Sequence, residues 1–274
     1  MITKKLHLIV ISCLLLVSAS FGQWSSNAGT NLLVSNASGD AVVPHIANTS
    51  TGGYFVAYYS NTGNYNIALQ YLDAYGVKKW ENELIVSDNA QDTWVTDFSI
   101  TVDQENNAII AFNDIRTGFS NAFAYKISPE GDFIWGENGI RLYQDSTKNA
   151  MVVKTCITES NSCVFAWNFV DNYTLGMQKL SDSGEKLWGE TVIIYSSTNP
   201  VTEPTVIPTE GENFIMVYYE RGGTSWSSPT WIYAQRFDAD GTPAWNPSLA
   251  VFNQGGLSLW TDYHLAIGTD NSVF

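Results

Sequence analysis

Four tryptophans recur at a nearly constant interval, and they constrain the fold of this 274-residue chain more than any other feature. They are separated by 55, 53 and 57 residues, and each follows a glycine with three residues between. The first segment, LDAYGVKKW, has an apolar residue, then Asp or Ser, two free positions, Gly, three free positions and Trp. A period of this length indicates a repeat architecture. The repeated residues are Trp80, Trp135, Trp188 and Trp245, with Gly76, Gly131, Gly184 and Gly241.

Each repeat contains four short runs of β-branched and aromatic residues, punctuated by Gly, Asn, Asp and Pro, which read as strands. The second run is almost continuously apolar, as expected for a strand buried on both faces. No helical periodicity is sustained after residue 22. We therefore predict an all-β fold, a β-propeller of four-stranded antiparallel blades of about 55 residues. A β-solenoid is the weaker alternative. In the propeller, each repeated Trp packs between neighbouring blades as a structural residue.

The two ends of the chain differ from the repeats. Residues 1–22 combine Lys4 and Lys5 with the apolar run Leu6–Val17 and then small residues, which predicts a signal peptide and a secreted or cell-surface protein. This apolar run is too short to span a bilayer. The last repeat stops within its expected second strand, so we expect a fragment of a longer chain. The predicted divisions are a closing strand at 23–34, blades at 35–87, 88–143, 144–195 and 196–252, and the start of a fifth, truncated blade at 253–274.

Without the two signal-peptide lysines, 11 basic residues face 27 acidic ones, a net charge of −16. Nucleic acid requires clustered Lys and Arg, so this charge argues against it as a partner. It also argues against an anionic membrane. We expect a monomer with no cofactor and no metal.

Cys156 and Cys163 are the only cysteines after residue 22. They flank a predicted hairpin between first and second strands, and a two-residue loop at Glu159-Ser160 would place them directly opposite one another. Export favours oxidation. We predict a disulfide, with two free thiols as the alternative.

Sequence motifs for known chemistry are absent, including the G-x-S-x-G elbow, the H-E-x-x-H zinc motif, the phosphate-binding Gly loop and the EF-hand loop. His45 and His264 occupy equivalent first-strand positions, which indicates a structural role. Two arginines, Arg116 and Arg221, are predicted on loops, too few for the arginine clamp of a sialidase. Asp114/Arg116 and Glu220/Arg221 are predicted to form loop salt bridges.

Binding candidates are the aromatic and acidic residues predicted on the loop face. Exposed Trp rings beside polar groups suit sugar stacking or protein contact, although they can equally cover blade edges. Three acids in corresponding pre-strand positions could form a rim around the central channel, or be ordinary solvated acids. The candidates are Trp94, Trp226, Trp231, Trp260, Asp97, Glu203 and Asp262.

The repeat resembles units of secreted surface proteins from Bacteroidota-type bacteria. The matching stretches are IYAQRFDADGTPAW (232–245), AFNDIRTG (111–118) and IWGENGIRL (134–142). The resemblance covers essentially all of 24–274 and implies export linked to a type IX secretion sorting domain, which lies outside this chain. The unit is also similar to Asp-box and quinoprotein-type propeller repeats, with one residue of difference in the Asp-to-Gly spacing.

Three functions are compatible with these features. We favour a binding or adhesion module for carbohydrate or a surface protein, and we expect binding rather than catalysis. The alternatives are an extracellular glycan hydrolase, sialidase-like or of another propeller type, with catalytic groups partly in missing blades, and a structural spacer.

Overall fold

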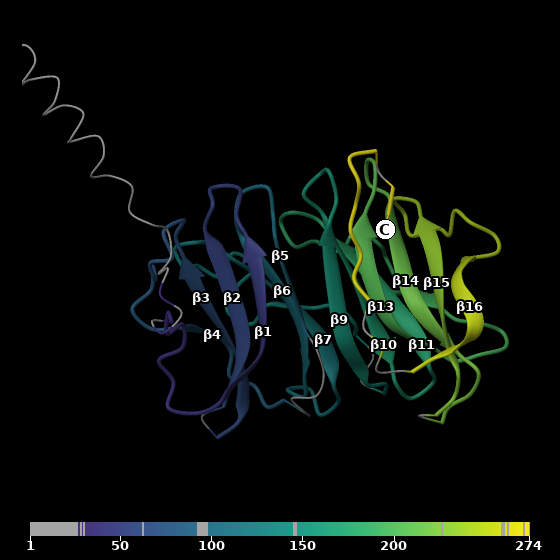
Figure 1. Ribbon diagram of the computed structural model, residues 1–274, viewed down its shortest axis with the longest axis horizontal. Coiled ribbons are helices and arrows are strands. Elements are labelled where there is room, and N and C mark those ends of the chain that lie inside the picture. Colours follow the sequence, from purple (N-terminus) through teal and green to yellow (C-terminus); the bar gives the residue numbers. More distant parts are fainter. Residues whose placement is uncertain are drawn as a thin grey trace, which may run out of the picture.

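A computed structural model describes residues 27, 29, 31–61, 63–91, 98–144, 147–225, 227–258, 261, 263–270 and 272–273. Within this part, the chain forms four four-stranded antiparallel sheets, and in each sheet the strands follow one another in sequence order. The sheets stand side by side (Figure 1). The first two consist of β1 (Ala41–Asn48), β2 (Tyr54–Asn61), β3 (Tyr65–Leu72) and β4 (Leu84–Ser87), and of β5 (Ser99–Val102), β6 (Ala108–Asp114), β7 (Asn121–Ile127) and β8 (Ile140–Arg141). The last two consist of β9 (Ala150–Ile157), β10 (Cys163–Phe169), β11 (Thr174–Leu180) and β12 (Val192–Ile194), and of β13 (Val201–Pro208), β14 (Phe214–Arg221), β15 (Thr230–Phe237) and β16 (Leu249–Leu257).

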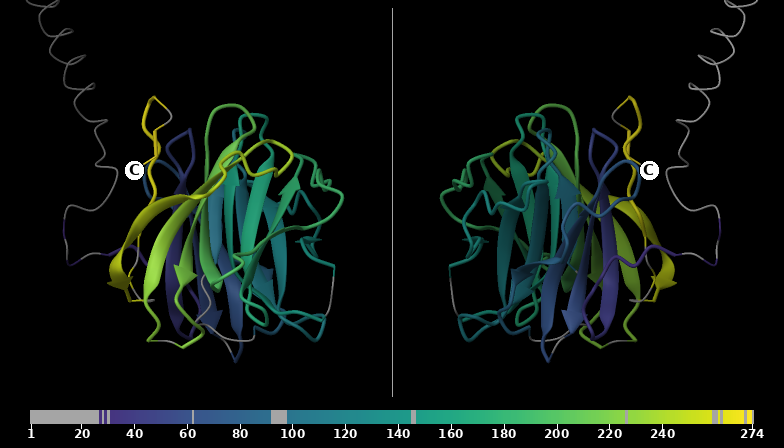
Figure 2. Two further views of the ribbon diagram at one scale, coloured as in Figure 1. Left: turned by 90° about the vertical axis from the view of Figure 1, so that its right-hand side faces the viewer. Right: turned by 90° about the vertical axis from the view of Figure 1, so that its left-hand side faces the viewer.

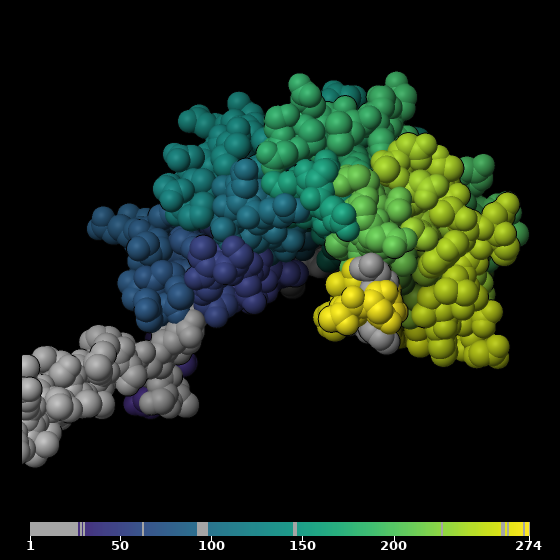
Figure 3. All heavy atoms as spheres, turned by 90° about the horizontal axis from the view of Figure 1, so that it is seen from above, coloured from purple at the N-terminus to yellow at the C-terminus, as the bar shows by residue number. Residues whose placement is uncertain are grey.

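The sheets are arranged as propeller blades, numbered 1 to 4 in chain order. Consecutive first strands contact one another, β1 with β5, β5 with β9, and β9 with β13. Seen from above, the blades follow an arc with a hollow on its concave side (Figure 3). The rotated views show the sheets stacked face against face (Figure 2). The predicted all-β propeller fold is therefore confirmed. Among the described residues, no helix is long and apolar enough to cross a membrane.

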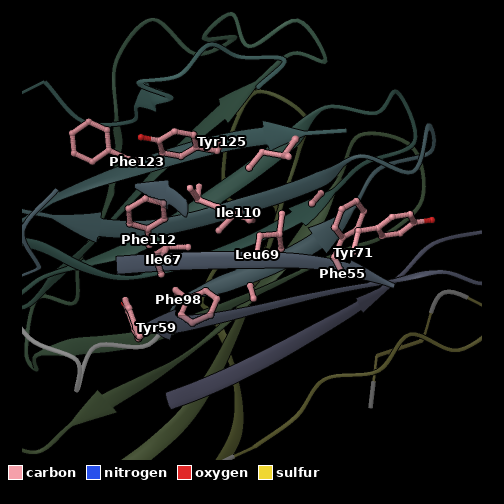
Figure 4. Close-up of a cluster of buried hydrophobic side chains, with 14 residues drawn as sticks. Phe55, Tyr59, Ile67, Leu69, Tyr71, Phe98, Ile110, Phe112, Phe123 and Tyr125 are labelled. Carbon is pink, nitrogen blue, oxygen red and sulfur yellow. The ribbon is translucent and has the colours of Figure 1, made fainter. Parts of the chain in front are cut away.

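The second strand of each blade lies in the core, as its continuous apolar sequence predicts. All seven residues of β6 and all seven of β10 are buried. Between blades 1 and 2, Phe55 and Leu69 pack in one cluster with Ile110 and Phe112 (Figure 4). Apolar surface removed from water in this way is the main stabilising contribution to the packing of one blade on the next.

The turn between third and fourth strands is built by the repeated Asp/Ser and Gly. In blade 1, the carboxylate of Asp73 accepts hydrogen bonds from the backbone N–H groups of Tyr75 and Val77, at 2.9 and 3.0 Å. Gly76 then adopts a φ of 75°, which an L side chain rarely adopts. The equivalent glycines of the other three blades also have positive φ.

Each repeated Trp of blades 1 to 3 reaches this turn in the following blade. The indole N–H of Trp80 donates to the carbonyl of Pro129 at 3.0 Å, that of Trp135 to Asp182 at 3.0 Å, and that of Trp188 to Ala239 at 3.1 Å. Trp245 packs against a cluster of Ile207, Ile215, Val217 and Ala234, and Tyr263 and Leu265 pack against the same cluster. The ring thus covers the neighbouring turn while its one polar group is satisfied there.

The predicted disulfide is wrong, because the hairpin has a different register. Asn161, with a φ of 64°, extends the loop to three residues. Cys163 is therefore paired with Ile157, and Cys156 with Val164. Successive residues of a strand point to opposite faces, so the one-residue shift separates the two thiols. Both cysteines are free and buried, and they belong to two different core clusters.

Candidate functional site

The first strands of blades 1, 3 and 4 share an irregularity near their beginning. The pairing with the second strand shifts register at this point in all three. The residue at the shift has positive φ: 52° at Val43, 55° at Val152 and 52° at Glu203. Such values are true outliers for β-branched residues and mark local strain. A bulge of this kind bends its strand locally and redirects the side chains that follow.

The residues two positions after these bulges meet in a cavity of about 560 Å³. His45 of β1, Lys154 of β9 and Thr205 of β13 line it, together with His264 from the segment that follows blade 4. The same strand position of blades 1, 3 and 4 therefore contributes to one cavity. The cavity, called the axial cavity below, lies where the central channel of a propeller is expected.

Glu203 borders the axial cavity and is held by the preceding blade. Asn168 of β10 donates from Nδ2 to the Glu203 carboxylate at 3.1 Å, and its Oδ1 accepts from the Glu203 backbone N–H at 2.8 Å. Asn168 is only 4% exposed. The buried amide therefore fixes both the bulge and the carboxylate of the half-buried glutamate.

Two tyrosines connect this bulge to the segment after blade 4. The single O–H of Tyr263 lies within hydrogen-bonding distance of two carbonyls, that of Glu203 at 3.2 Å and that of Val217 at 3.1 Å. The Tyr219 hydroxyl donates to the carbonyl of Thr261, and the two rings lie 5.3 Å apart. Burial raises the pKa of the Tyr263 phenol. The phenol therefore remains a proton donor to these carbonyls throughout the physiological pH range.

Glu203 also borders a second cavity of about 250 Å³ between blades 3 and 4, called the interblade cavity below. Val152, Tyr173 and Arg221 line it as well. Val152, Tyr173 and Glu203 are three of the six non-glycine residues with positive φ in the described chain. Backbone strain is thus concentrated around this cavity.

One group of three carboxylates in the described chain lies close enough to suggest a metal site, but a lysine occupies its centre. Asp103, Glu105 and Asp182 form the group. The ammonium of Lys126 lies 2.8 Å from Asp103 and 2.6 Å from Asp182. Burial alone would lower the pKa of Lys126, but its hydrogen bonds to both aspartates raise the pKa above its ordinary value. The ammonium therefore already supplies the charge that a cation would bring.

The same third-strand position carries a cation in the next two blades. Lys179 lies 2.7 Å from Glu212, and Arg236 lies 3.0 Å from Glu210. Desolvation would raise the pKa of Glu212, but hydrogen bonds from Lys179 and Thr158 lower it to about 2. These ion pairs join third strands to turns between first and second strands, and they are structural.

Of the binding candidates, the structure describes Trp231 and Glu203. Trp231 donates its indole N–H to the carbonyl of Gly255 at 3.1 Å and packs beside Gly222, so it holds a loop and borders neither cavity. The other candidates, Trp94, Trp226, Trp260, Asp97 and Asp262, lie outside the described residues.

Sequence reasoning missed four residues of the two cavities: Asn168, Lys154, Tyr263 and Arg221. The alignment of first strands contains a signal for Lys154, because His45 and His264 share its position. The two histidines, predicted as purely structural, line the axial cavity.

The two predicted loop salt bridges have different outcomes. Arg116 pairs with Asp114 at 2.5 Å and its guanidinium lies 3.9 Å from the centre of the Phe123 ring. The second pair is wrong: Arg221 ends β14, and the Glu220 carboxylate instead accepts from Asn199 at 2.8 Å and Ser196 at 3.2 Å. Adjacent strand residues face opposite sides, so Glu220 and Arg221 are kept apart.

No known protein-family model matches the chain, and no curated protein sequence does so. Solved structures do share its fold. An endo-arabinase from Bacteroides thetaiotaomicron is 15% identical with a TM-score of 0.47, covering 84% of this chain and 86% of that one. An α-L-arabinofuranosidase from Podospora anserina, in complex with cellotriose, is 13% identical with a TM-score of 0.43, covering 78% and 68%. An ulvan lyase, a polysaccharide lyase bound to a GlcA–Rha3S unit, is 8% identical with a TM-score of 0.52, covering 78% of this chain and 59% of that one.

At such identities the likeness establishes the fold, a β-propeller. The comparison also corrects our functional expectation. The similar structures are named as glycan-cleaving enzymes, including arabinanases, a xylanase and a family-43 glycoside hydrolase. The first expectation, a binding or adhesion module, is therefore wrong on these findings.

Proposed function

We propose that this protein is an extracellular glycan hydrolase whose reaction takes place in the axial cavity. The observation that carries the proposal is the placement of Glu203. Its carboxylate is held by a buried amide at the border of a cavity to which the first strands contribute His45, Lys154 and Thr205. A carboxylate fixed in a concave polar site is the group that glycosidic bond cleavage requires.

Glycoside hydrolysis uses two carboxylates, one to exchange a proton with the leaving oxygen and one to activate water or attack the sugar. Glu203 supplies the first of these groups. In the aligned sequence repeats, Asp97 and Asp262 correspond to Glu203, each two residues before the position that His45, Lys154 and Thr205 share. We propose that one of them supplies the second carboxylate.

The strain at the bulges supports the same interpretation. Val43, Val152 and Glu203 hold positive φ at one equivalent point in three blades. Unfavourable backbone conformations persist where the surrounding structure over-determines them, and they are concentrated at active sites. A purely architectural blade would gain stability from a regular strand at these positions.

The test is release of reducing sugar from a panel of neutral and acidic polysaccharides, including arabinan, xylan and galactan. Active protein carrying Glu203→Gln should lose activity by roughly 10²- to 10⁴-fold, the usual contribution of an acid–base group. Glu210→Gln is the matched control, because its carboxylate is exposed and pairs with Arg236 on the outer part of blade 4. Absence of reducing sugar from every substrate, or unchanged activity in Glu203→Gln, would refute the proposal.

Two finer proposals concern the rest of the chain. Ile267 and Val273 form a β-bridge, and Gly268 donates to Ser272 as Asp103 does to Asn107 in blade 2. Because β16 of blade 4 extends to Leu257, five residues beyond the predicted boundary at 252, we propose that the segment after Leu257 begins a fifth blade. The repeat resemblance and residues 1–22 support export through a signal peptide in a Bacteroidota-type secretion context. N-terminal sequencing of secreted protein should begin at Gln23.

A further inference from the structure

Arg221 is a buried cation that forms no ion pair with any described residue. The residue is 5% exposed at the end of β14. Its guanidinium donates one hydrogen bond from Nη2 to the carbonyl of Ser225, at 2.6 Å, and its Nε has no partner. The neighbouring carboxylate of Glu220 is engaged with Asn199 and Ser196 on the other face of the strand. No ion pair joins Arg221 to any described acid.

The free side of this guanidinium belongs to the interblade cavity. Arg221 and Thr224 line it from blade 4, while Asn168, Phe169 and Tyr173 line it from blade 3. Neighbouring blades thus form its two walls, and the loops after β10 and β14 contribute Val170, Tyr173 and Thr224 to its lining. Glu203 stands between this cavity and the axial cavity, because it lines both.

A buried guanidinium that lacks an ion-pair partner is costly, and the cost is reduced when an anion occupies the adjacent space. The planar fork of Arg matches a carboxylate, with two parallel N–H···O bonds. The volume of about 250 Å³ is below the roughly 300–1,000 Å³ of pockets for drug-sized ligands. A single sugar unit therefore fits the space better than an oligosaccharide.

We propose that the interblade cavity binds the carboxylate of one uronic acid unit, with Arg221 as its counter-charge. The proposal rests on the proposed glycan hydrolase function and specifies its substrate class, an acidic glycan. A uronate held by Arg221 would present its glycosidic linkage beside Glu203, the residue shared by both cavities. Neutral sugars would leave the guanidinium unpaired and would be discriminated against.

Calorimetric titration of the secreted protein separates this proposal from the hydrolase proposal. The probes are methyl glucuronoside, methyl galacturonoside, the neutral methyl glucoside and sodium acetate. At least one uronoside should bind roughly 10- to 100-fold more tightly than methyl glucoside, which is the range of a charged hydrogen bond. Arg221→Met should abolish this preference. Arg236→Met should retain it, because Arg236 is a half-buried arginine of the same blade that pairs with Glu210 and lines neither cavity.

Each result has a defined meaning. Equal affinity of wild-type protein for both uronosides and the neutral glucoside would overturn the proposal without any variant, so misfolding of Arg221→Met cannot protect it. Acetate binding as tightly as the uronosides would overturn the assignment to a sugar unit. Glu203→Gln should retain uronoside binding while cleavage is lost. Uronoside preference in a protein that cleaves no glycan would therefore refute the hydrolase and keep the acidic-sugar site.

Discussion

Asn168 and Glu203 are joined by two reciprocal hydrogen bonds, of 3.1 Å to the carboxylate and 2.8 Å from the backbone N–H, across the boundary between blades 3 and 4. The side-chain amide of Asn168 thus holds both the strained backbone and the carboxylate of Glu203. The equivalent residue of blade 2, Asn113, is also buried but donates to Ser120 within its own blade. Of these two equivalent asparagines, Asn168 is the one that orients the candidate catalytic carboxylate.

Replacement of Asn168 should separate positioning from stability. We expect Asn168→Ala to lower the free energy of unfolding by about 1–3 kcal/mol, because the backbone N–H of Glu203 loses its acceptor. It should also lower kcat for glycan cleavage, with a smaller change in KM, since Glu203 loses its orientation. Asn113→Ala is the control: a similar loss of stability with normal kcat is expected. Equal effects of the two variants on kcat would show that Asn168 has no positioning role.

The interblade tryptophans should contribute strongly to stability. Trp188 is 7% exposed and its indole N–H donates to Ala239. Trp188→Ala should lower the free energy of unfolding by about 3–5 kcal/mol through the cavity it leaves. Trp188→Phe should cost about 1 kcal/mol for the lost hydrogen bond plus a smaller packing loss. Urea denaturation measures both, with Tyr195→Ala, 72% exposed, as a control expected to change little. A shift of Trp188→Ala no larger than that of the control would contradict the packing role.

The ion pair between Lys179 and Glu212 predicts a pH dependence of stability. The pKa of Glu212 is lowered to about 2 in the folded protein, from an ordinary value of 4.5. A lowered folded pKa stabilises the protein above the unfolded pKa, and this contribution is lost as the pH falls toward 2. Glu212→Gln should therefore lower Tm at pH 7, and the difference from wild type should shrink between pH 5 and 2. A constant difference in Tm over that range would contradict the prediction.

The cysteines should behave as two inert thiols. Burial raises the pKa of Cys163 to about 12, and burial likewise raises the pKa of Cys156. The reactive thiolate is therefore scarce at neutral pH. In protein lacking residues 1–22, a thiol reagent should detect no cysteine in the native state and two in denaturant without reductant. Detection of thiols only after reduction would instead establish a disulfide.

Much of the fold was predictable because its signals are local and repeated. The Asp-x-x-Gly turn and the following Trp are short-range features, and their spacing alone indicated four-stranded units and their order. The continuous apolar runs likewise identified the second strands. The sequence also identified Glu203 as a candidate, because the aligned repeats carry an acidic residue at the same position, Asp97, Glu203 and Asp262.

The site itself was decided by contacts between blades. Asn168 reaches Glu203 across the boundary between blades 3 and 4, and Tyr263 reaches two carbonyls of blade 4 from the segment that follows it. Arg221 forms no ion pair with Glu220, because the two side chains lie on opposite faces of β14. One positive φ at Asn161 moved the hairpin register by a residue and separated Cys156 from Cys163. The apolar runs of the sequence determined which strands form the core, since a continuously apolar strand is buried on both faces. The tertiary structure alone decided which buried polar groups find a partner, because that depends on the register and approach of neighbouring sheets.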